Sequence, residues 1–345
     1  MKAVEVTGYG GFEQLQVTDR EVPSPNAGEV LVKVKACGIN NTEIWMREGA
    51  YGTGEESGWR PEGVQFPRIP GSDITGQIVE VGEGVEPHKV GEDVILFPFT
   101  SSGEAGMEHL SDDLSFIGSE YDGGYAEYVV WKEELCYPMP LPDYTQSAVV
   151  VVSGLTAWHM VEQSNVGSED VVMVTGANGG VGSYNVQIAS KVRGATVIAI
   201  VGDLELSDKM KELGADYVFS YKSSTLQQDI LEEVGKVDVV LDVVGDALFD
   251  TSLQVLRKGG RFCTSGSSGG QQTNMDFRAV YLNHIALLGS VLGTREDFKN
   301  LLQAVSQYKV KPTVAKTFPL SEARDAQAYF KESGKLGKVV LLPEE

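Results

Sequence analysis

The segment Val171–Gly182, with the sequence VVMVTGANGGVG, has the residue types and order of a phosphate-binding turn. A short β-branched run enters a glycine-rich turn, and an amphipathic segment, Val181–Arg193, leaves it. The first N–H groups of a helix have no intrahelical partner, and the helix dipole places partial positive charge beside them. Such a terminus attracts a pyrophosphate, so the segment predicts a dinucleotide site rather than a purely structural strand–turn–helix.

The turn departs from the strict GxGxxG spacing at its first position, where Ala177 stands in place of glycine. Alanine is compatible with a turn that keeps φ negative at that residue. The candidate cofactor-binding residues of the turn are Gly176, Ala177, Asn178, Gly179, Gly180 and Val181.

Strand-like and helical segments alternate through the second half of the chain. The helical patterns fill most of the gaps, and Gly214 is placed to end one helix. Near-continuous apolar strands in this order predict a doubly wound parallel sheet that binds ligand beyond the carboxyl ends of its strands. The expected strands are Val171–Thr175, Thr196–Val201, Tyr217–Tyr221, Val237–Val244, Arg261–Ser265 and Ala286–Leu292.

The first half, from Met1 to about Pro140, consists of short strand-like runs separated by Gly, Pro and Asp, which predicts a small β-barrel or a distorted sandwich. Its polar segment Thr100–Gly118 is expected to be a surface lobe. The last 50 or so residues hold a helical stretch, Glu296–Tyr308, and a short apolar tail, and they are expected to return to the first domain. The expected strands are Val30–Lys35, Gly76–Val81, Val94–Phe97 and Gly124–Val130.

The composition limits the partners and the compartment. A formal net charge of −21 over 345 residues argues against nucleic acid or an anionic membrane surface as a partner. It fits an acidic soluble enzyme, with adaptation to salt as an alternative. The three cysteines are far apart, which fits a reducing cytosol, and no segment has the length of a membrane span or the pattern of a signal peptide. We therefore expect a cytoplasmic protein.

Several motifs, in this order along nearly the whole chain, resemble the medium-chain dehydrogenase/reductase superfamily, and most closely its zinc-free quinone oxidoreductase and enoyl reductase branch. The resemblance implies an α/β protein with a GroES-like β-barrel catalytic domain over 1–148 and 295–345 and a Rossmann domain over 149–294. It also implies a homodimer that pairs through Ala286–Leu292. Besides the glycine turn, the matching segments are Ala36–Gly49, Pro70–Val85, Val90–Val94, Asp122–Val130, Gly154–Trp158, Glu212–Tyr221, Val237–Gly245 and Gly337–Leu341.

The resemblance also indicates whether the enzyme binds zinc. Zinc alcohol dehydrogenases of the superfamily bind catalytic zinc with Cys, His and Cys, and those positions here are Asn40, Ser72 and Val152. The four cysteines of their structural zinc lobe have no counterpart in Thr100–Gly118, and the four histidines are scattered. The sequence therefore predicts an enzyme without zinc.

Without a metal Lewis acid, an unactivated alcohol or ketone is a difficult substrate. A quinone or an α,β-unsaturated carbonyl delocalises the incoming charge itself, so modest hydrogen-bond donors suffice. Asn40 can donate its amide to the acceptor oxygen or the nicotinamide, Thr42 can donate a hydroxyl, and Trp45 and Tyr51 can line an apolar cleft. Helix capping for the polar pair and plain core packing for the aromatic pair are the alternatives.

The remaining cofactor contacts follow from the resemblance. Thr156 corresponds to a threonine that contacts the nicotinamide amide, and Tyr221 to a tyrosine near the 2′-phosphate of NADPH. Lys338 can reach the cofactor phosphates, with a surface salt bridge as the alternative. Asp203 is either a ribose ligand or a solvated loop acid, and with Glu205 and Asp208 it favours NADH. The resemblance favours NADPH. Asp73 is expected to be structural and to bond backbone between the domains, as the resemblance implies.

These observations predict an NAD(P)H-dependent, zinc-independent reductase that transfers hydride to a quinone or an enone, with a small-molecule substrate. The alternatives are an alcohol dehydrogenase with altered metal, a reductase of CoA thioesters, and a nucleotide-binding or redox-sensing protein without catalysis. The proton donor, the substrate's identity and its stereochemistry stay open.

Overall fold

The computed structural model describes residues 1–51, 64–332 and 334–344. The chain divides into two units, and each is described by itself. Unit 1 comprises Met1–Val152, Pro312–Glu332 and Lys338–Glu345, and unit 2 comprises Ser153–Lys311 and Ser333–Gly337.

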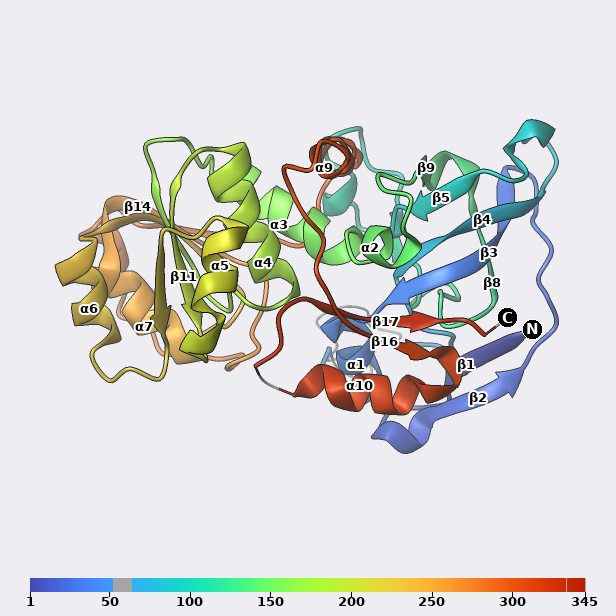
Figure 1. Ribbon diagram of the computed structural model, residues 1–345, viewed down its shortest axis with the longest axis horizontal. Helices are drawn as coiled ribbons and strands as arrows, with labels where there is room; N and C mark the ends of the chain where they lie inside the picture. Colours follow the sequence, from blue (N-terminus) through green and yellow to red (C-terminus); the bar gives the residue numbers. More distant parts are fainter. Residues whose placement is uncertain (52–63, 333, 345) are drawn as a thin grey trace. The chain divides into compact units, whose positions relative to one another are not determined.

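Unit 2 is built on one parallel sheet with the strand order β12-β11-β10-β13-β14-β15 (Figure 1). The order reverses direction between β10 and β13, which is the switch point of a Rossmann-like doubly wound sheet. The sequence-based expectation of a parallel sheet is confirmed. The strands are β10 Val171–Val174, β11 Thr196–Val201, β12 Tyr217–Ser220, β13 Val237–Asp242, β14 Leu256–Thr264 and β15 Ala286–Gly289.

The strands β10, β11 and β13 of this sheet are buried on both faces because they carry apolar side chains at nearly every position, whereas β15 is largely exposed. Met173, Ile198 and Val240 share a buried cluster with side chains of α6 and α7. The helices are α4 Gly180–Gln187, which continues as a π-helix over Ile188–Val192, α5 Ser207–Leu213, α6 Leu226–Glu233, α7 Asp246–Val255, α8 Phe277–Tyr281 and α9 Arg295–Ser306; α3 Val151–Gln163 begins at the end of unit 1.

Unit 1 contains a sheet in the order β16-β17-β3-β4-β5-β9, with β8 paired to β3, and two small antiparallel pairs, β1-β2 and β6-β7. In Figure 1, α10 lies along β16 and β17. The strands are β1 Lys2–Val6, β2 Leu15–Asp19, β3 Glu29–Gly38, β4 Asp73–Val81, β5 Asp93–Leu96, β6 Phe99–Thr100, β7 Ser115–Phe116, β8 Tyr128–Lys132, β9 Cys136–Pro138, β16 Val314–Pro319 and β17 Lys338–Leu342; the helices are α1 Asn41–Glu48, α2 Tyr144–Ala148 and α10 Ala323–Lys331.

Besides shifts in strand ends, such as that of β15, which ends at Gly289 and not at Leu292, three details differ from the sequence-based expectations. The strand expected at Gly124–Val130 begins only at Tyr128, because the N–H groups of Gly124 and Tyr125 bond to the Gly71 and Pro70 carbonyls. The segment Thr100–Gly118 is not wholly a surface lobe, since it contributes to β6 and β7 and buries Phe116. The return of the chain to unit 1 begins at Pro312, after α9, and not at residue 295.

A buried arginine fixes α1 within unit 1. The Arg47 side chain is fully buried, and its Nη1 donates to the Gly10 carbonyl at 2.5 Å while Nη2 donates to Gln327 Oε1 at 3.3 Å. These bonds connect α1 to the N-terminal loop and to α10, so they fix the position of the residues at the start of α1.

None of the helices in the described ranges combines the length and apolarity of a membrane span.

Candidate functional site

The glycine turn of unit 2 has the geometry of an anion site. Gly176 has φ +56°, a conformation that favours glycine, and the Gly179 N–H closes the turn on the Gly176 carbonyl at 2.9 Å. Gly179 caps α4, so the N–H groups that follow it have no intrahelical carbonyl to bond. Ala177 is not among the described residues with positive φ, so alanine fits there without strain. These residues suit a dinucleotide pyrophosphate.

A buried carboxylate holds the strand ends around this turn. Asp242, the last residue of β13, accepts from Thr175 Oγ1 at 2.7 Å and from Thr264 Oγ1 at 2.9 Å. It also accepts from the backbone N–H groups of Val244 and Gly245. Burial raises the pKa of Asp242, whereas these hydrogen bonds act to lower it. One side chain therefore joins the carboxyl ends of β10, β13 and β14, where the sheet binds its ligand.

Unit 1 contains a buried polar cluster formed by residues far apart in the sequence. Lys338, at the start of β17, is 2% exposed, and its Nζ donates to Asp73 Oδ2 at 2.5 Å and to Asn40 Oδ1. The second oxygen of Asp73 accepts from the backbone N–H of Val152 at 2.8 Å. Asp73 thus bonds backbone, as expected. The surface salt bridge considered for Lys338 is wrong, because both members of the ion pair are buried.

Glu43 completes the cluster from the first turn of α1. Its Oε2 accepts from the Asn40 backbone N–H at 2.7 Å, and its Oε1 accepts from the Ser72 N–H at 3.2 Å. Asn40 is the N-cap of α1 and shares a capping box with Glu43. The Asn40 Nδ2 lies 3.5 Å from Glu43 Oε1. Asn40 therefore has the capping role considered above, and its side chain also faces Lys338.

The charges of Asp73 and Lys338 have opposite effects on the pKa of the buried Glu43 carboxyl group. Burial raises the pKa of Glu43 to about 7; the charge of Asp73 adds to the rise, and the charge of Lys338 opposes it. Burial also raises the pKa of the adjacent Cys37 thiol. The cluster therefore contains one ammonium and two carboxyl groups, and Glu43 is protonated more readily than an ordinary glutamate.

The residues present do not fit a catalytic zinc ion. At the three positions that the resemblance assigns to its ligands, the side chains are a carboxamide, a hydroxyl and an isopropyl group. Asn40 Oδ1 faces the Lys338 ammonium, and Ser72 Oγ donates to the Ile117 carbonyl at 2.9 Å. Within residues 1–51, 64–332 and 334–344, no group of three His, Cys, Asp or Glu side chains could hold a metal ion.

The aromatic candidates lie at the far end of α1 from the cap. Trp45 and Tyr51 meet edge to face with ring centroids 5.9 Å apart. A hydrogen bond from Thr42 acts to lower the pKa of Tyr51, but burial raises it by more. Thr42, Trp45 and Tyr51 are all half-buried, so the structure groups them on one short segment that begins at Asn40.

The adenosine end of the predicted cofactor site lies at the carboxyl end of β11. Asp203 accepts from the Glu205 N–H at 2.9 Å and caps the short helix Leu204–Leu206. Tyr221 is 49% exposed, and a Cβ added at Gly202 would lie 2.8 Å from its hydroxyl. Thr156 is buried on α3. These three residues all belong to unit 2.

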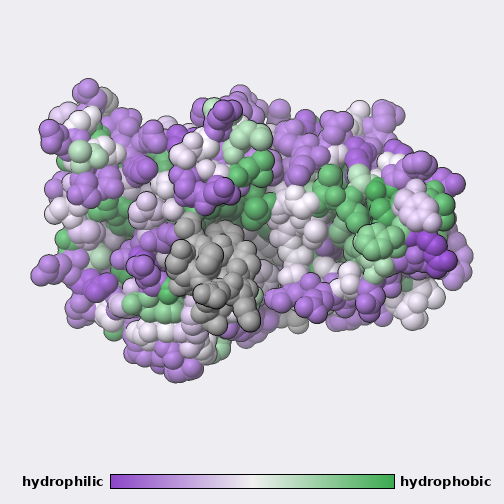
Figure 2. Space-filling view, turned by 180° about the vertical axis from the view of Figure 1, so that it is seen from behind, coloured by the Kyte–Doolittle hydropathy of each residue, from purple (hydrophilic) through white to green (hydrophobic). Residues whose placement is uncertain are grey.

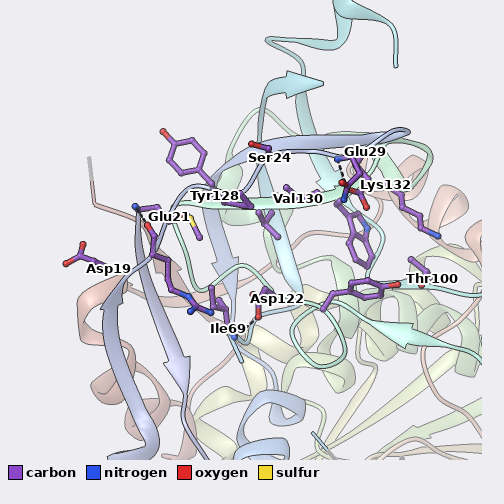
Figure 3. Close-up of a pocket in the computed structure, with 17 residues that line it drawn as sticks. Asp19, Glu21, Ser24, Glu29, Ile69, Thr100, Asp122, Tyr128, Val130 and Lys132 are labelled. Carbon is purple, nitrogen blue, oxygen red and sulfur yellow. Dashed lines mark hydrogen bonds between the residues drawn. The ribbon is translucent and has the colours of Figure 1, made fainter. Parts of the chain in front are cut away.

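A separate groove of about 760 Å³ lies in unit 1 (Figure 3). Its charged lining comes from β2 and the chain that follows it, the start of β3, the segment before β8, and β8 itself. These residues are Asp19, Arg20, Glu21, Glu29, Asp122 and Lys132. None of the predicted site residues lines it. The groove therefore does not belong to the candidate site.

Sequence reasoning missed Glu43 as a member of the site. The spacing Asn40-x-x-Glu43 is that of a capping box, and this signal could have placed the Glu43 carboxylate against the Asn40 backbone. No local signal connects Lys338 with Asp73, since 265 residues separate them.

Comparison with known proteins identifies the class. Residues 26–141 match the alcohol dehydrogenase GroES-like domain, and residues 180–307 match the zinc-binding dehydrogenase family. With the Rossmann-like sheet and its glycine turn, these matches define an NAD(P)-dependent oxidoreductase with a GroES-like domain.

Three curated relatives and a solved structure cover almost the whole chain. The relatives are an NAD-dependent alcohol dehydrogenase of Sulfurisphaera tokodaii (30% identity, 99% of this chain, 100% of the relative), a quinone oxidoreductase of Rattus norvegicus (31%, 99% and 98%) and an acryloyl-coenzyme A reductase of Metallosphaera sedula (30%, 99% and 99%). A crystal structure from Sinorhizobium meliloti 1021 has 38% identity and a TM-score of 0.94, over 100% of this chain and 97% of that chain. The chain belongs to the medium-chain dehydrogenase/reductase superfamily.

The glycine turn gives a direct test of the cofactor site. A Cβ at Gly182 would lie 2.2 Å from the Gly176 carbonyl oxygen, so Gly182→Ala must open the turn. We expect the dissociation constant for NADPH, measured by fluorescence titration, to rise about tenfold or more. Gly167→Ala is the matched control, because its nearest neighbour atom is 3.9 Å away. Equal binding by both variants and the unmodified protein would contradict the assignment.

The buried Glu43 predicts a pH dependence of stability. Its folded-state pKa of about 7 exceeds the ordinary 4.5, so the folded protein retains a proton that the unfolded chain releases. This contribution to the free energy of unfolding is present below about pH 4.5 and is lost as the pH rises to about 7, by roughly 3 kcal/mol. Glu43→Gln should flatten this fall in urea unfolding between about pH 5 and 8. The exposed Glu83→Gln should leave it unchanged; an unaltered slope in Glu43→Gln refutes the assignment.

Proposed function

We propose that this protein is a zinc-independent reductase that transfers hydride from NADPH or NADH to a quinone or an α,β-unsaturated carbonyl. The observation that carries the proposal is the chemistry of the buried cluster. Where zinc relatives place thiolate and imidazole ligands, this chain has Asn40, Ser72 and Val152, and the nearby cation is the ammonium of Lys338. The quinone oxidoreductase of Rattus norvegicus, at 31% identity over 99% of this chain, agrees with this substrate class.

In this mechanism the protein binds the cofactor, donates hydrogen bonds to the acceptor and lines the acceptor site. When bound, the reduced nicotinamide supplies the hydride. The residues of the glycine turn hold the cofactor's pyrophosphate, and Thr156 contacts the nicotinamide amide. Asn40 and Thr42 donate hydrogen bonds to the acceptor oxygen as negative charge spreads onto it through the conjugated system. Trp45 supplies an apolar wall for a flat acceptor, and the final proton comes from solvent or a hydroxyl.

Two variants of this function have support among the relatives. An alcohol dehydrogenase activity agrees with the Sulfurisphaera tokodaii relative, but it needs a strong electrophile beside the oxygen, and the donor set does not supply one. Reduction of a CoA thioester agrees with the Metallosphaera sedula relative. The net charge of −21 counts against an anionic CoA substrate, so we favour a neutral quinone or enone.

For the cofactor, we propose NADPH as the preferred form, with NADH also accepted. The Tyr221 hydroxyl packs close to Gly202 at the end of β11, where the resemblance places a tyrosine beside the 2′-phosphate. Asp203 uses its carboxylate to cap the following helix. The negative charges of Asp203, Glu205 and Asp208 act in the opposite direction and keep NADH competitive.

The proposal predicts a distinct substrate pattern. Oxidation of NADPH and of NADH should be followed with a quinone, an enone and the corresponding saturated ketone, with and without a chelator. We expect turnover of the quinone or enone in both conditions, little with the ketone, and a higher kcat/KM for NADPH. Metal analysis should find no stoichiometric zinc. Preferential ketone reduction that the chelator abolishes would overturn the proposal, and a higher kcat/KM for NADH would overturn the cofactor preference.

We also propose a homodimer that forms through β15. This strand is the last one of the sheet of unit 2. Figure 2 shows hydrophobic side chains gathered on one face of unit 2. The exposed apolar residues of α8 and β15 with their flanks are Phe277, Tyr281, Leu282, Leu287 and Val291. A free strand edge beside an apolar patch can continue its sheet into a second copy.

Changing one residue of this patch should separate the subunits. Leu287, on β15, is 41% exposed, and Leu287→Lys places a charge on the expected contact. We expect light scattering to give the mass of a dimer for the unmodified protein and of a monomer for the variant. Leu110→Lys, at a 63% exposed leucine of unit 1, is the control and should stay dimeric. A monomeric unmodified protein, or a dimeric Leu287→Lys, excludes this interface.

A further inference from the structure

We infer that Lys338 is a positioning residue that turns the Asn40 carboxamide and polarises it, so that the amide N–H presented to the substrate oxygen is a stronger donor. This inference rests on the proposed function, in which Asn40 donates to the acceptor oxygen. It adds a second residue, on a distant strand, that acts through the first.

The orientation of Asn40 follows from the chemistry of its neighbour. An ammonium group donates hydrogen bonds and cannot accept them, so the carboxamide atom that faces Lys338 Nζ is the oxygen Oδ1. The amino end, Nδ2, is thereby turned away from the ammonium. Its contact with Glu43 Oε1 is 3.5 Å long, which is weak for an N–H···O bond and can be exchanged for a shorter bond to an oxyanion.

The ammonium is held firmly enough to fix this orientation. Lys338 is 2% exposed and Asp73 is fully buried, and Nζ lies 2.5 Å from Asp73 Oδ2. Asp73 is held in turn by the Val152 backbone N–H at 2.8 Å. The anchored ammonium therefore has little freedom to leave the Asn40 oxygen. The ion pair with Asp73 alone would neutralise the charge of Lys338. The additional contact with Asn40 is what fixes the orientation of the carboxamide.

The same contact strengthens the donor. A positive charge on the carbonyl oxygen draws electron density through the conjugated amide and makes its N–H groups more acidic. Because the surroundings are buried, water does little to screen the effect. Lys338 thus delivers part of its charge to the substrate oxygen through Asn40, without touching the substrate.

A double-mutant cycle tests this inference. Lys338→Met removes the charge but keeps the chain length, Asn40→Ala removes the relay, and the third variant combines both. We expect kcat with an enone or quinone to fall about tenfold or more in Lys338→Met. The double variant should be about as slow as Asn40→Ala alone, because the two residues act in series. The dissociation constant for NADPH, measured by fluorescence, should stay unchanged in Lys338→Met.

Two further variants separate positioning from folding. Lys338→Arg retains the charge and should restore much of kcat. Lys338→Met/Asp73→Asn removes both members of the ion pair, so it leaves no unpaired buried charge, and it should remain slow while keeping the thermal midpoint of the unmodified protein.

Two results would overturn the inference while the proposed function stands. One is a folded Lys338→Met protein with unchanged kcat or with losses that simply add to those of Asn40→Ala. The other is a variant whose loss lies in NADPH binding, which would make Lys338 a phosphate ligand. If the unmodified protein reduces neither a quinone nor an enone, the proposed function fails and the inference fails with it.

Discussion

The proposed mechanism of this protein depends on the contacts that the Lys338 ammonium makes with Asp73 and Asn40. Removing charges from water is costly, and a buried ion pair persists only where further hydrogen bonds satisfy both partners. Here the Val152 N–H and the Asn40 carbonyl oxygen provide those bonds. The cluster is a hydrogen-bonding centre with a single lysine side chain as its cation, and it includes two of the positions, Asn40 and Ser72, that the resemblance assigns to catalytic zinc ligands.

This difference in charge changes which substrates can react. A divalent metal can stabilise an alkoxide that has no other means of spreading its charge. A carboxamide, even one polarised by an ammonium, offers a hydrogen bond of ordinary strength. In the proposed mechanism the acceptor must then delocalise the electrons that arrive with the hydride, as a conjugated carbonyl or a quinone does. The curated relatives include alcohol dehydrogenases, quinone oxidoreductases and acryloyl-coenzyme A reductases, and the proposal for this chain depends on the chemistry of its own cluster.

The fold of unit 2 could be predicted from the sequence to a large extent. The strand expected at Thr196–Val201 has those bounds in the structure, because an apolar, largely β-branched run suits an inner strand of a parallel sheet. The conformation of the glycine turn followed from its residue types. Unit 1 was harder, as the late start of β8 shows: its sequence alternates from Gly124 onward, but the backbone there bonds to residues 70 and 71. Partners so distant leave no local pattern.

The candidate site could be predicted only in part, for the same reason. Asn40 was identified from its motif, and Glu43 could have been identified from its spacing. The pairing of Lys338 with Asp73 arises because β17 and β4 both lie beside β3. Neither segment contains a local pattern that predicts this arrangement of strands. The most direct test is an X-ray anomalous scattering measurement at the zinc edge, on crystals grown with added zinc. We expect no anomalous peak in the cluster and an unbroken contact between Lys338 and Asn40. A peak bonded to Asn40 or Ser72, with the Lys338 side chain displaced, would contradict it.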